Sequence, residues 1–437
     1  MFRSRPRRPS WTRAAGALTA LATAGALLAG CGGSSNGRAQ LTWYINPDGG
    51  GSDPTKGGQA QLAAECSTGQ YKIDIQLLPN SASDQRTGLL RRLAAGDSSM
   101  DLMSIDPVYV PEFAEAGYLA PVPSSMQADF EADRVQSALD AAKWQGKLVA
   151  VPFWANTQLL WYRKSIAAKA GLNMKNPVTW DQLISAAQQT KTTIGVQAML
   201  YEGYTVWINA LVRGAGGQIV DNPGATYDSL KLGLNSQAGE DAASIISKVS
   251  STGVGGPAMG SSDETASLNL FQGPTGGFLV NWPYTYAALK SAGVSWLNDV
   301  GATLYPRTVA SDPSAPPFGG IDLAVGSKSA HVQDAYEAAK CITSPAHQAA
   351  YMVATGNPAS DKSAFTDPSV EKAFPNGIAA LIGQSLENAA PRPQSQYYGD
   401  ISTGLQQQFS PPSSVSSQTP DKAQNFITQV LDGKALL

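Results

Sequence analysis

The segment DLMSIDPVYVPEFAE, residues 101–115, contains the pattern that decides the fold class. It begins with a short apolar run, DLMSI, which is typical of a buried strand. Asp106 and Pro107 follow, and this pair favours a turn that leads into a helix through Phe113 and Glu115. The segment therefore predicts a strand that passes through a tight turn into a helix.

The residues before this segment show the same alternation of strand and helix. Residues 41–45 and 71–78 alternate as strands do, whereas residues 59–66 and 84–95 have helical patterns. The predicted order is β-α-β-α-β. Such an order implies an α/β fold with a mainly parallel sheet, and these sheets bind ligands beyond the carboxyl ends of their strands.

The rest of the chain continues with strands and helices. Once the leader described below is removed, about 400 residues remain, which is too many for one compact core and predicts two domains or lobes. Residues 144–152 are predicted to form a hairpin turn that leads into a strand, and further strands are predicted at residues 159–162, 276–282, 301–306 and 322–326. Helices are predicted at residues 180–189, with Thr179 as the expected N-cap, and at residues 204–215, 241–251 and 333–341.

Composition and charge narrow the range of partners. The hydrophobic fraction is 43%, which permits sizeable cores, and the net charge is −3. No basic cluster remains after the leader, so nucleic acid and anionic lipid surfaces are poor partners. Nine Trp and fifteen Tyr supply rings of the kind that cover the apolar faces of sugars.

Residues 1–30 are predicted to be a signal peptide. Five arginines between positions 3 and 13 precede an uncharged stretch at 14–28 that is too short to span a bilayer unaided. The stretch ends in LAGC, which resembles the bacterial lipobox, so we expect Cys31 to carry lipid and to anchor an extracytoplasmic protein to the cell membrane. Residues 31–40 would form a flexible tether. The alternative is a plain signal peptide with a chance cysteine.

Two further cysteines, Cys66 and Cys341, remain if Cys31 is acylated. An even pair in an oxidising compartment is most simply one disulfide. Two separately buried thiols are the alternative.

Four segments resemble the sugar-binding proteins of bacterial ABC importers, which are family 1 of the extracellular solute-binding proteins. They are DLMSIDPVYVPEFAEAGYLAPV (101–122), GKLVAVPFWANTQLLWYRK (146–164), GFLVNWPYTY (277–286) and APRPQSQYY (390–398). Within the family, the chain looks most like the trehalose-binding lipoproteins of mycobacteria and related actinobacteria. NTQLLWYR (156–163), EGYTVWIN (202–209) and the placement of the cysteine pair carry this closer resemblance.

The resemblance implies a two-lobed fold like that of periplasmic binding proteins, with the ligand in the cleft between the lobes. It places residues 41–151 and 307–345 in lobe one, and residues 152–306 and 346–437 in lobe two. It also implies a monomer that delivers its ligand to permease subunits. Transport energy would come from a separate cytoplasmic ATPase, because this chain has no GxxxxGKS or GxxxxGKT phosphate loop.

A sugar site needs planar polar side chains that pair with hydroxyls and aromatic rings that stack on C–H faces. The resemblance implies ten ligand-binding residues that meet these needs or allow close backbone approach. They are Asp48, Gln85, Asp106, Asn156, Glu202, Trp207, Asn281, Trp282, Gly320 and Arg392.

Several of these residues also have structural interpretations. Asp106 could be a helix N-cap, and Asn156 an ordinary turn residue. Trp207 and Trp282 could belong to the core. Arg392, between two prolines, could form a surface salt bridge.

Trehalose is the expected ligand, and maltose or another α-glucoside is the alternative. A glycoside-active enzyme is a further alternative, because glycosidases also gather carboxylates and aromatic rings in clefts. We expect a receptor and not an enzyme, with no cofactor and no metal. The chain contains no HExxH motif.

Overall fold

The structure is a computed structural model, and it describes residues 38–47 and 58–437. The predicted signal peptide, Cys31, most of the tether and Asp48 lie outside the described residues.

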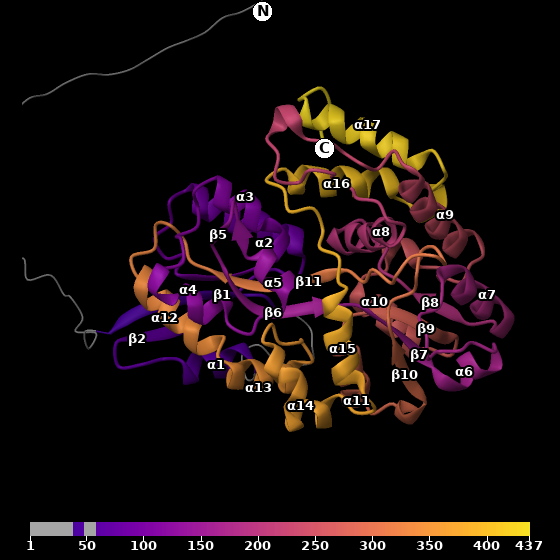
Figure 1. Cartoon of the computed structure of the whole chain (residues 1–437), viewed down its shortest axis with the longest axis horizontal. Coiled ribbons are helices and arrows are strands. Elements are labelled where there is room, and N and C mark those ends of the chain that lie inside the picture. The colour runs from indigo at the N-terminus through magenta and orange to yellow at the C-terminus, as the bar shows by residue number, and fades with distance from the viewer. Residues whose placement is uncertain (1–37, 48–57) are drawn as a thin grey trace, which may run out of the picture. The chain divides into compact units, whose positions relative to one another are not determined.

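Five strands form the first sheet, in the order β2-β1-β3-β11-β6 (Figure 1). β1 runs parallel to β2 and β3, whereas β11 runs antiparallel to β3 and β6. The strands are β1 (Ala39–Ile45), β2 (Tyr71–Leu77), β3 (Leu102–Ile105), β6 (Val151–Thr157) and β11 (Phe318–Ala324).

Helices connect the parallel strands of this sheet, as the β-α-β-α-β pattern predicts. All four residues of β3 are buried, which is why the strand is mainly apolar and does not alternate; its one polar residue, Ser104, accepts a hydrogen bond from the indole of Trp43. The helices and 3₁₀ turn of this part are α1 (Gln59–Glu65), α2 (Ala82–Ala94), η1 (Pro107–Tyr109), α3 (Val110–Glu115), α4 (Ser124–Glu131), α5 (Gln136–Ala141) and α12 (Val332–Ile342).

Four strands form the second sheet, in the order β10-β7-β9-β8. They are β7 (Leu159–Arg163), β8 (Thr193–Gly195), β9 (Gly276–Asn281) and β10 (Val300–Thr303). Its helices are α6 (Lys164–Lys169), α7 (Trp180–Thr190), α8 (Glu202–Gly214), α9 (Gln237–Ser251), α10 (Glu264–Gln272), α11 (Tyr284–Ser291), α16 (Tyr398–Phe409) and α17 (Thr419–Leu431).

The chain passes between the two sheets more than once. Only Gln158 separates β6 of the first sheet from β7 of the second, and the segment after β10 returns to β11 of the first sheet. Near these crossings, a separate hydrophobic cluster joins α5 to α13 (Pro345–Thr355), α14 (Pro368–Ala373) and α15 (Ile378–Glu387). The exact lobe boundaries given above stay a prediction.

A disulfide joins Cys66, at the end of α1, to Cys341 in α12. The pairing agrees with the expectation from the cysteine count. It connects two helices of the first sheet's layer that are 275 residues apart in the sequence.

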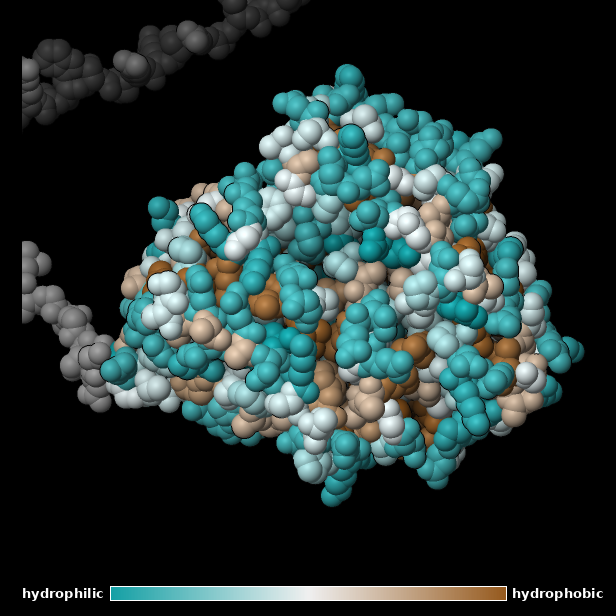
Figure 2. All heavy atoms as spheres, viewed as in Figure 1, coloured by the Kyte–Doolittle hydropathy of each residue, from teal (hydrophilic) through white to brown (hydrophobic). Residues whose placement is uncertain are grey.

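The visible face of the molecule is mainly hydrophilic (Figure 2). Among the described residues, no helix combines the length and the apolar character needed to cross a membrane.

Candidate ligand-binding site

A cavity of about 490 Å³ lies between elements of the two sheets. Asn46, Asn80 and Asp106 reach it from segments that follow β1, β2 and β3, so it opens beyond the carboxyl ends of these parallel strands. The opposite wall comes from the second sheet and its helices. The polar and aromatic lining residues are Asn46, Asn80, Ser81, Gln85, Asp106, Trp154, Asn156, Tyr201, Glu202, Asp263, Glu264, Thr265, Trp282, Tyr284, Asn357 and Arg392.

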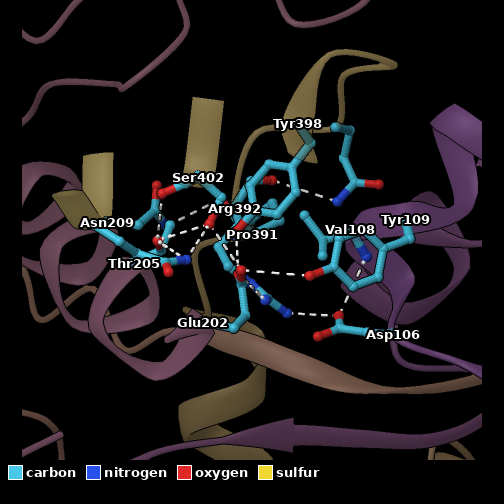
Figure 3. Close-up of polar contacts among 12 residues, drawn as sticks. Asp106, Val108, Tyr109, Glu202, Thr205, Asn209, Pro391, Arg392, Tyr398 and Ser402 are labelled. Atoms are coloured by element: carbon cyan, nitrogen blue, oxygen red, sulfur yellow. Dashed lines mark hydrogen bonds and ion pairs between the residues drawn. The ribbon is translucent and has the colours of Figure 1, made fainter. Parts of the chain in front are cut away.

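One wall of the cavity holds a buried ion network (Figure 3). The guanidinium of Arg392 donates from Nη1 to Glu202 Oε1 and from Nη2 to Asp106 Oδ1, each over 2.6 Å. Asp106 directly follows β3 and Glu202 begins α8, so a single arginine bridges the layers of the two sheets. Arg392 and Glu202 are each 4% exposed.

Asp106 has both of the roles considered for it. Its Oδ1 accepts from the backbone N–H of Val108 over 3.3 Å, which caps η1, and the same carboxylate binds Arg392 and lines the cavity. The N-cap fixes the direction of the carboxylate, which places it within reach of a ligand.

Glu202 is held by more than the arginine. Its Oε1 also accepts from the hydroxyl of Tyr398, and its Oε2 accepts from Ser402 over 2.7 Å and from Tyr109 over 3.4 Å. Burial raises the pKa of Glu202, whereas Arg392 acts to lower it. The carboxylate is therefore oriented on all sides before any ligand arrives.

The charge of Arg392 is stabilised by its neighbours. Burial alone would lower the pKa of Arg392, but Asp106, Tyr398 and Glu202 raise it well above its ordinary value. The surface salt bridge considered from the sequence is therefore wrong, because the ion pairs of Arg392 are buried against the cavity.

Trp282 lines the cavity at the end of β9, and its neighbours fix its position. Asn281 is fully buried. Its Oδ1 accepts from the backbone N–H of Trp282 over 2.8 Å, and its Nδ2 donates to the carbonyl of Glu264 over 3.0 Å. Asn281 does not line the cavity, so it orients Trp282 and is not placed to contact a ligand there. A Cβ on Gly319 would lie 3.1 Å from the indole, so this glycine leaves room for the ring.

Gly320 lines the floor of the cavity with a φ of 132°, which favours glycine. A Cβ there would lie 2.2 Å from the carbonyl oxygen of Trp154 in the neighbouring strand. Only glycine lets β11 pair this closely with β6 at the cavity.

Asn156 and Gln85 also line the cavity. Asn156 lies near the end of β6, and its Oδ1 accepts from the backbone N–H of Thr157 over 3.1 Å. Gln85 donates from Nε2 to the carbonyl of Pro79 over 2.7 Å. Both side chains are therefore held in place beside the cavity by bonds to the backbone.

Trp207 does not line the cavity, so the expected ligand contact is not supported there. It is 1% exposed and packs in the core, 5.7 Å from the ring of Trp180 and 6.2 Å from that of Tyr204. The reason is helical geometry. Trp207 follows Glu202 by five residues in α8, and five residues turn a helix by about 140°, so the two side chains leave on different faces.

Sequence reasoning missed an acidic wall built by Tyr201, Asp263 and Glu264. The hydroxyl of Tyr201 donates to Glu264 Oε2 over 2.6 Å, and burial raises the pKa of Glu264. Asp263 caps α10 by accepting from Ala266 N over 2.7 Å. In the sequence, an acidic pair that starts a helix is an ordinary capping signal, so nothing local marked it as a cavity wall.

Two α/β lobes with a polar and aromatic cavity between them define the class of the protein: it has the two-lobed fold of periplasmic binding proteins. The sequence identifies the family. Residues 55–349 match the model of the bacterial extracellular solute-binding proteins, and the chain belongs to this family.

Relatives agree with this assignment. A probable ABC transporter-binding protein of Deinococcus radiodurans is 27% identical over 369 residues, which is 81% of this chain and 83% of the relative. Among solved structures, maltose-bound T. maritima MalE3 superposes with a TM-score of 0.76 at 20% identity, covering 91% of this chain and all of that one. UgpB of Mycobacterium tuberculosis, in complex with glycerophosphocholine, gives 0.75 at 18% identity, covering 92% and 100%. These structures show the shared fold.

Proposed function

We propose that this protein is the lipid-anchored receptor of an ABC sugar importer, which captures a disaccharide and delivers it to membrane permease subunits. Trehalose is the proposed ligand. The observation that carries the proposal is the cavity between the two sheets, with its buried Asp106–Arg392–Glu202 network and the indole of Trp282. Its volume of about 490 Å³ falls within the range of about 300–1,000 Å³ that small-molecule sites occupy.

The chemistry of the lining suits a neutral polyhydroxylated ligand. Carboxylates and amide oxygens accept from sugar hydroxyls, amide and guanidinium nitrogens donate to them, and an indole covers a C–H face. Among the described residues, the lining has four acidic side chains and one arginine, a balance that disfavours anionic ligands. The names of several similar proteins, which mention maltose and diacetylchitobiose, support a sugar ligand.

Closure of the lobes would complete the site. Asp106 comes from the layer of the first sheet, and Glu202 and Trp282 come from that of the second. A ligand held by one lobe would be covered by the other through hinge bending, which excludes water and strengthens each hydrogen bond. The closed form would then dock on the permease, and a separate ATPase would supply the energy.

An enzyme is the weaker alternative. A glycosidase needs one carboxyl that donates a proton and a second that attacks or activates water. Asp106 and Glu202 both hold Arg392, and Glu202 accepts further hydrogen bonds from hydroxyls. These contacts suit orientation of a bound ligand better than proton transfer.

Calorimetry of the purified protein with trehalose, maltose and sucrose tests the proposal. We expect saturable binding of trehalose with one site per chain, and weaker or no binding of the other two. Binding of maltose but not trehalose would refute the choice of ligand. Release of glucose from any of these sugars, lost on Asp106→Asn, would refute the receptor function.

The lipid anchor has its own test. Mass spectrometry of the mature N-terminal peptide should show acyl chains on Cys31, and Cys31→Ser should release the protein from membranes. A mature N-terminus at any other residue would refute the anchor while leaving the sugar receptor intact.

A further inference from the structure

A second cavity, of about 100 Å³, lies behind the wall that Arg392 forms in the ligand cavity. Its lining comes from α8, from the loop after that helix and from the segment between α15 and α16. Arg392 lines both cavities, so it forms part of the wall between them. The residues of the second cavity are Asn209, Arg213, Gln218, Ile219, Val220, Pro223, Pro391, Arg392, Pro393 and Gln394.

Among the described residues, the charged side chains that line this cavity are both arginines, Arg213 and Arg392. Arg213 forms no ion pair with any side chain in the described part of the chain, and its guanidinium makes one long contact, 3.5 Å from Nη1 to the carbonyl of Gly217. Arg392 uses Nη1 and Nη2 for the carboxylates of the ligand cavity, but its Nε is buried and has no hydrogen-bond partner among the residues that the structure describes. A buried guanidinium N–H without a partner costs free energy, and a bound acceptor would remove that cost.

The two arginines need acceptors, whereas one other lining side chain, Gln394, needs a hydrogen-bond donor. Gln394 Oε1 is buried and accepts no hydrogen bond from the described part of the chain, so it needs a donor. The amide of Asn209 does not supply that donor: the hydrogen bond that its Nδ2 makes goes to the carbonyl of Pro391 over 3.3 Å, and no described residue donates to Gln394 Oε1 (Figure 3). A ligand that fits this cavity therefore has to accept from two guanidinium groups and also donate to an amide oxygen.

We propose that the second cavity is a binding site for a small protonated oxyanion, and that inorganic phosphate is the ion that fits it. Phosphate at neutral pH has acceptor oxygens for Arg213 and Arg392, and it keeps a P–O–H group that donates to Gln394. Sulfate has the same shape but no proton to donate. The cavity has room for one such ion, since a single water needs only about 10–15 Å³ of the same kind of volume.

An anion at this position acts on the ligand site through Arg392. The anion binds Nε on the side of the second cavity. This bond holds the guanidinium in the orientation in which Nη1 and Nη2 contact Glu202 and Asp106 on the side of the ligand cavity. Because the ordering of Arg392 is then already present, a sugar that uses this side chain binds more tightly, and the effect is reciprocal. This coupling rests on the proposed sugar-receptor function, whereas the anion site itself does not.

Calorimetry with sodium phosphate tests the site directly. The mature protein is held in a HEPES and gluconate buffer of constant ionic strength, free of sulfate and phosphate. We expect saturable 1:1 binding of phosphate, at least tenfold weaker binding in Arg213→Gln, and at least fivefold weaker binding of sulfate in the wild type. Arg213→Gln is a clean variant because Arg213 does not line the ligand cavity.

The second arm measures trehalose affinity with and without phosphate. We expect a several-fold gain in wild-type affinity on adding phosphate and no change in Arg213→Gln, whose affinity in phosphate-free buffer equals that of the wild type.

Absence of saturable phosphate binding, or phosphate binding that Arg213→Gln leaves unchanged, would overturn the site. Equal binding of sulfate would overturn the choice of a protonated oxyanion. Phosphate binding of the expected kind without any sugar binding would refute the receptor function and leave the anion site standing.

Discussion

Replacing Arg392 by lysine is the most informative single change, because it keeps the positive charge and removes the planar guanidinium with its two terminal nitrogens. The guanidinium reaches Glu202 with Nη1 and Asp106 with Nη2, each at 2.6 Å. A lysine ammonium is a single charged nitrogen at the end of a flexible side chain. It cannot reproduce two contacts that run to carboxylates on two different elements. Lys at 392 should therefore keep one carboxylate paired and leave the other without its donor.

The magnitude follows from burial. Hydrogen bonds to charged groups contribute about 1.5–3 kcal/mol each, and these side chains are at most 15% exposed, so solvent screening is small. Arg392→Lys should weaken trehalose binding by about 10- to 100-fold if one such contact is lost from the complex. Arg392→Met leaves two carboxylates unpaired in the absence of ligand, and should lower the free energy of unfolding by about 3–5 kcal/mol.

Calorimetry for affinity and urea unfolding for stability measure the two effects separately. Arg163→Lys is the matched control, since Arg163 pairs with Asp299 through one 2.8 Å contact away from the cavity. It should change trehalose affinity less than twofold. Wild-type affinity in Arg392→Lys, together with wild-type stability in Arg392→Met, would refute the reasoning.

Three further predictions concern other parts of the molecule. Trp282→Ala should weaken sugar binding about tenfold or more in calorimetry, whereas Trp207→Phe should lower the unfolding midpoint and leave affinity within twofold, since only the first ring lines the cavity. The pair Cys66→Ser with Cys341→Ser should lower the free energy of unfolding by about 2–5 kcal/mol with unchanged sugar affinity, and equal urea midpoints would contradict this. Burial, and then Asp106, raise the pKa of Asp322 well above its ordinary value. As pH rises above about 4, the unfolded chain loses this proton before the folded chain does, so wild-type stability should fall relative to Asp322→Asn, and a pH-independent difference between pH 4 and 8 would contradict the assignment.

The local sequence predicted much of the scaffold for physical reasons that act over short distances. Thr179 and Gln182 form the capping box that begins α7, as the expected cap at Thr179 indicates. Gln145 and Gly146 have positive φ in the turn of the predicted hairpin between β4 (Lys143–Trp144) and β5 (Lys147–Leu148). The three-residue strand β8 was missed, because so short a segment shows no periodicity and forms through its pairing with β9.

The candidate site was predicted less completely. Asp106, Asn156, Trp282 and Arg392 lie around one cavity as the resemblance implied, although they come from four separate segments of the chain. Glu264 was missed because an acidic residue at the start of a helix is common, and the sequence around it does not show which side chains pack against it in the fold.

Sequence alone determined the alternation of strands and helices, the even cysteine pair and the family, since these depend on periodicity, residue counts and local motifs. The tertiary structure decided which polar side chains face each other. Glu202 and Trp207 are neighbours on one helix, yet one enters the ion network and the other the core, because the helix presents them on different faces. Arg392 meets Asp106 across 286 residues of sequence, and it does so only because two sheets bring a proline-flanked segment and a strand end to the same cavity.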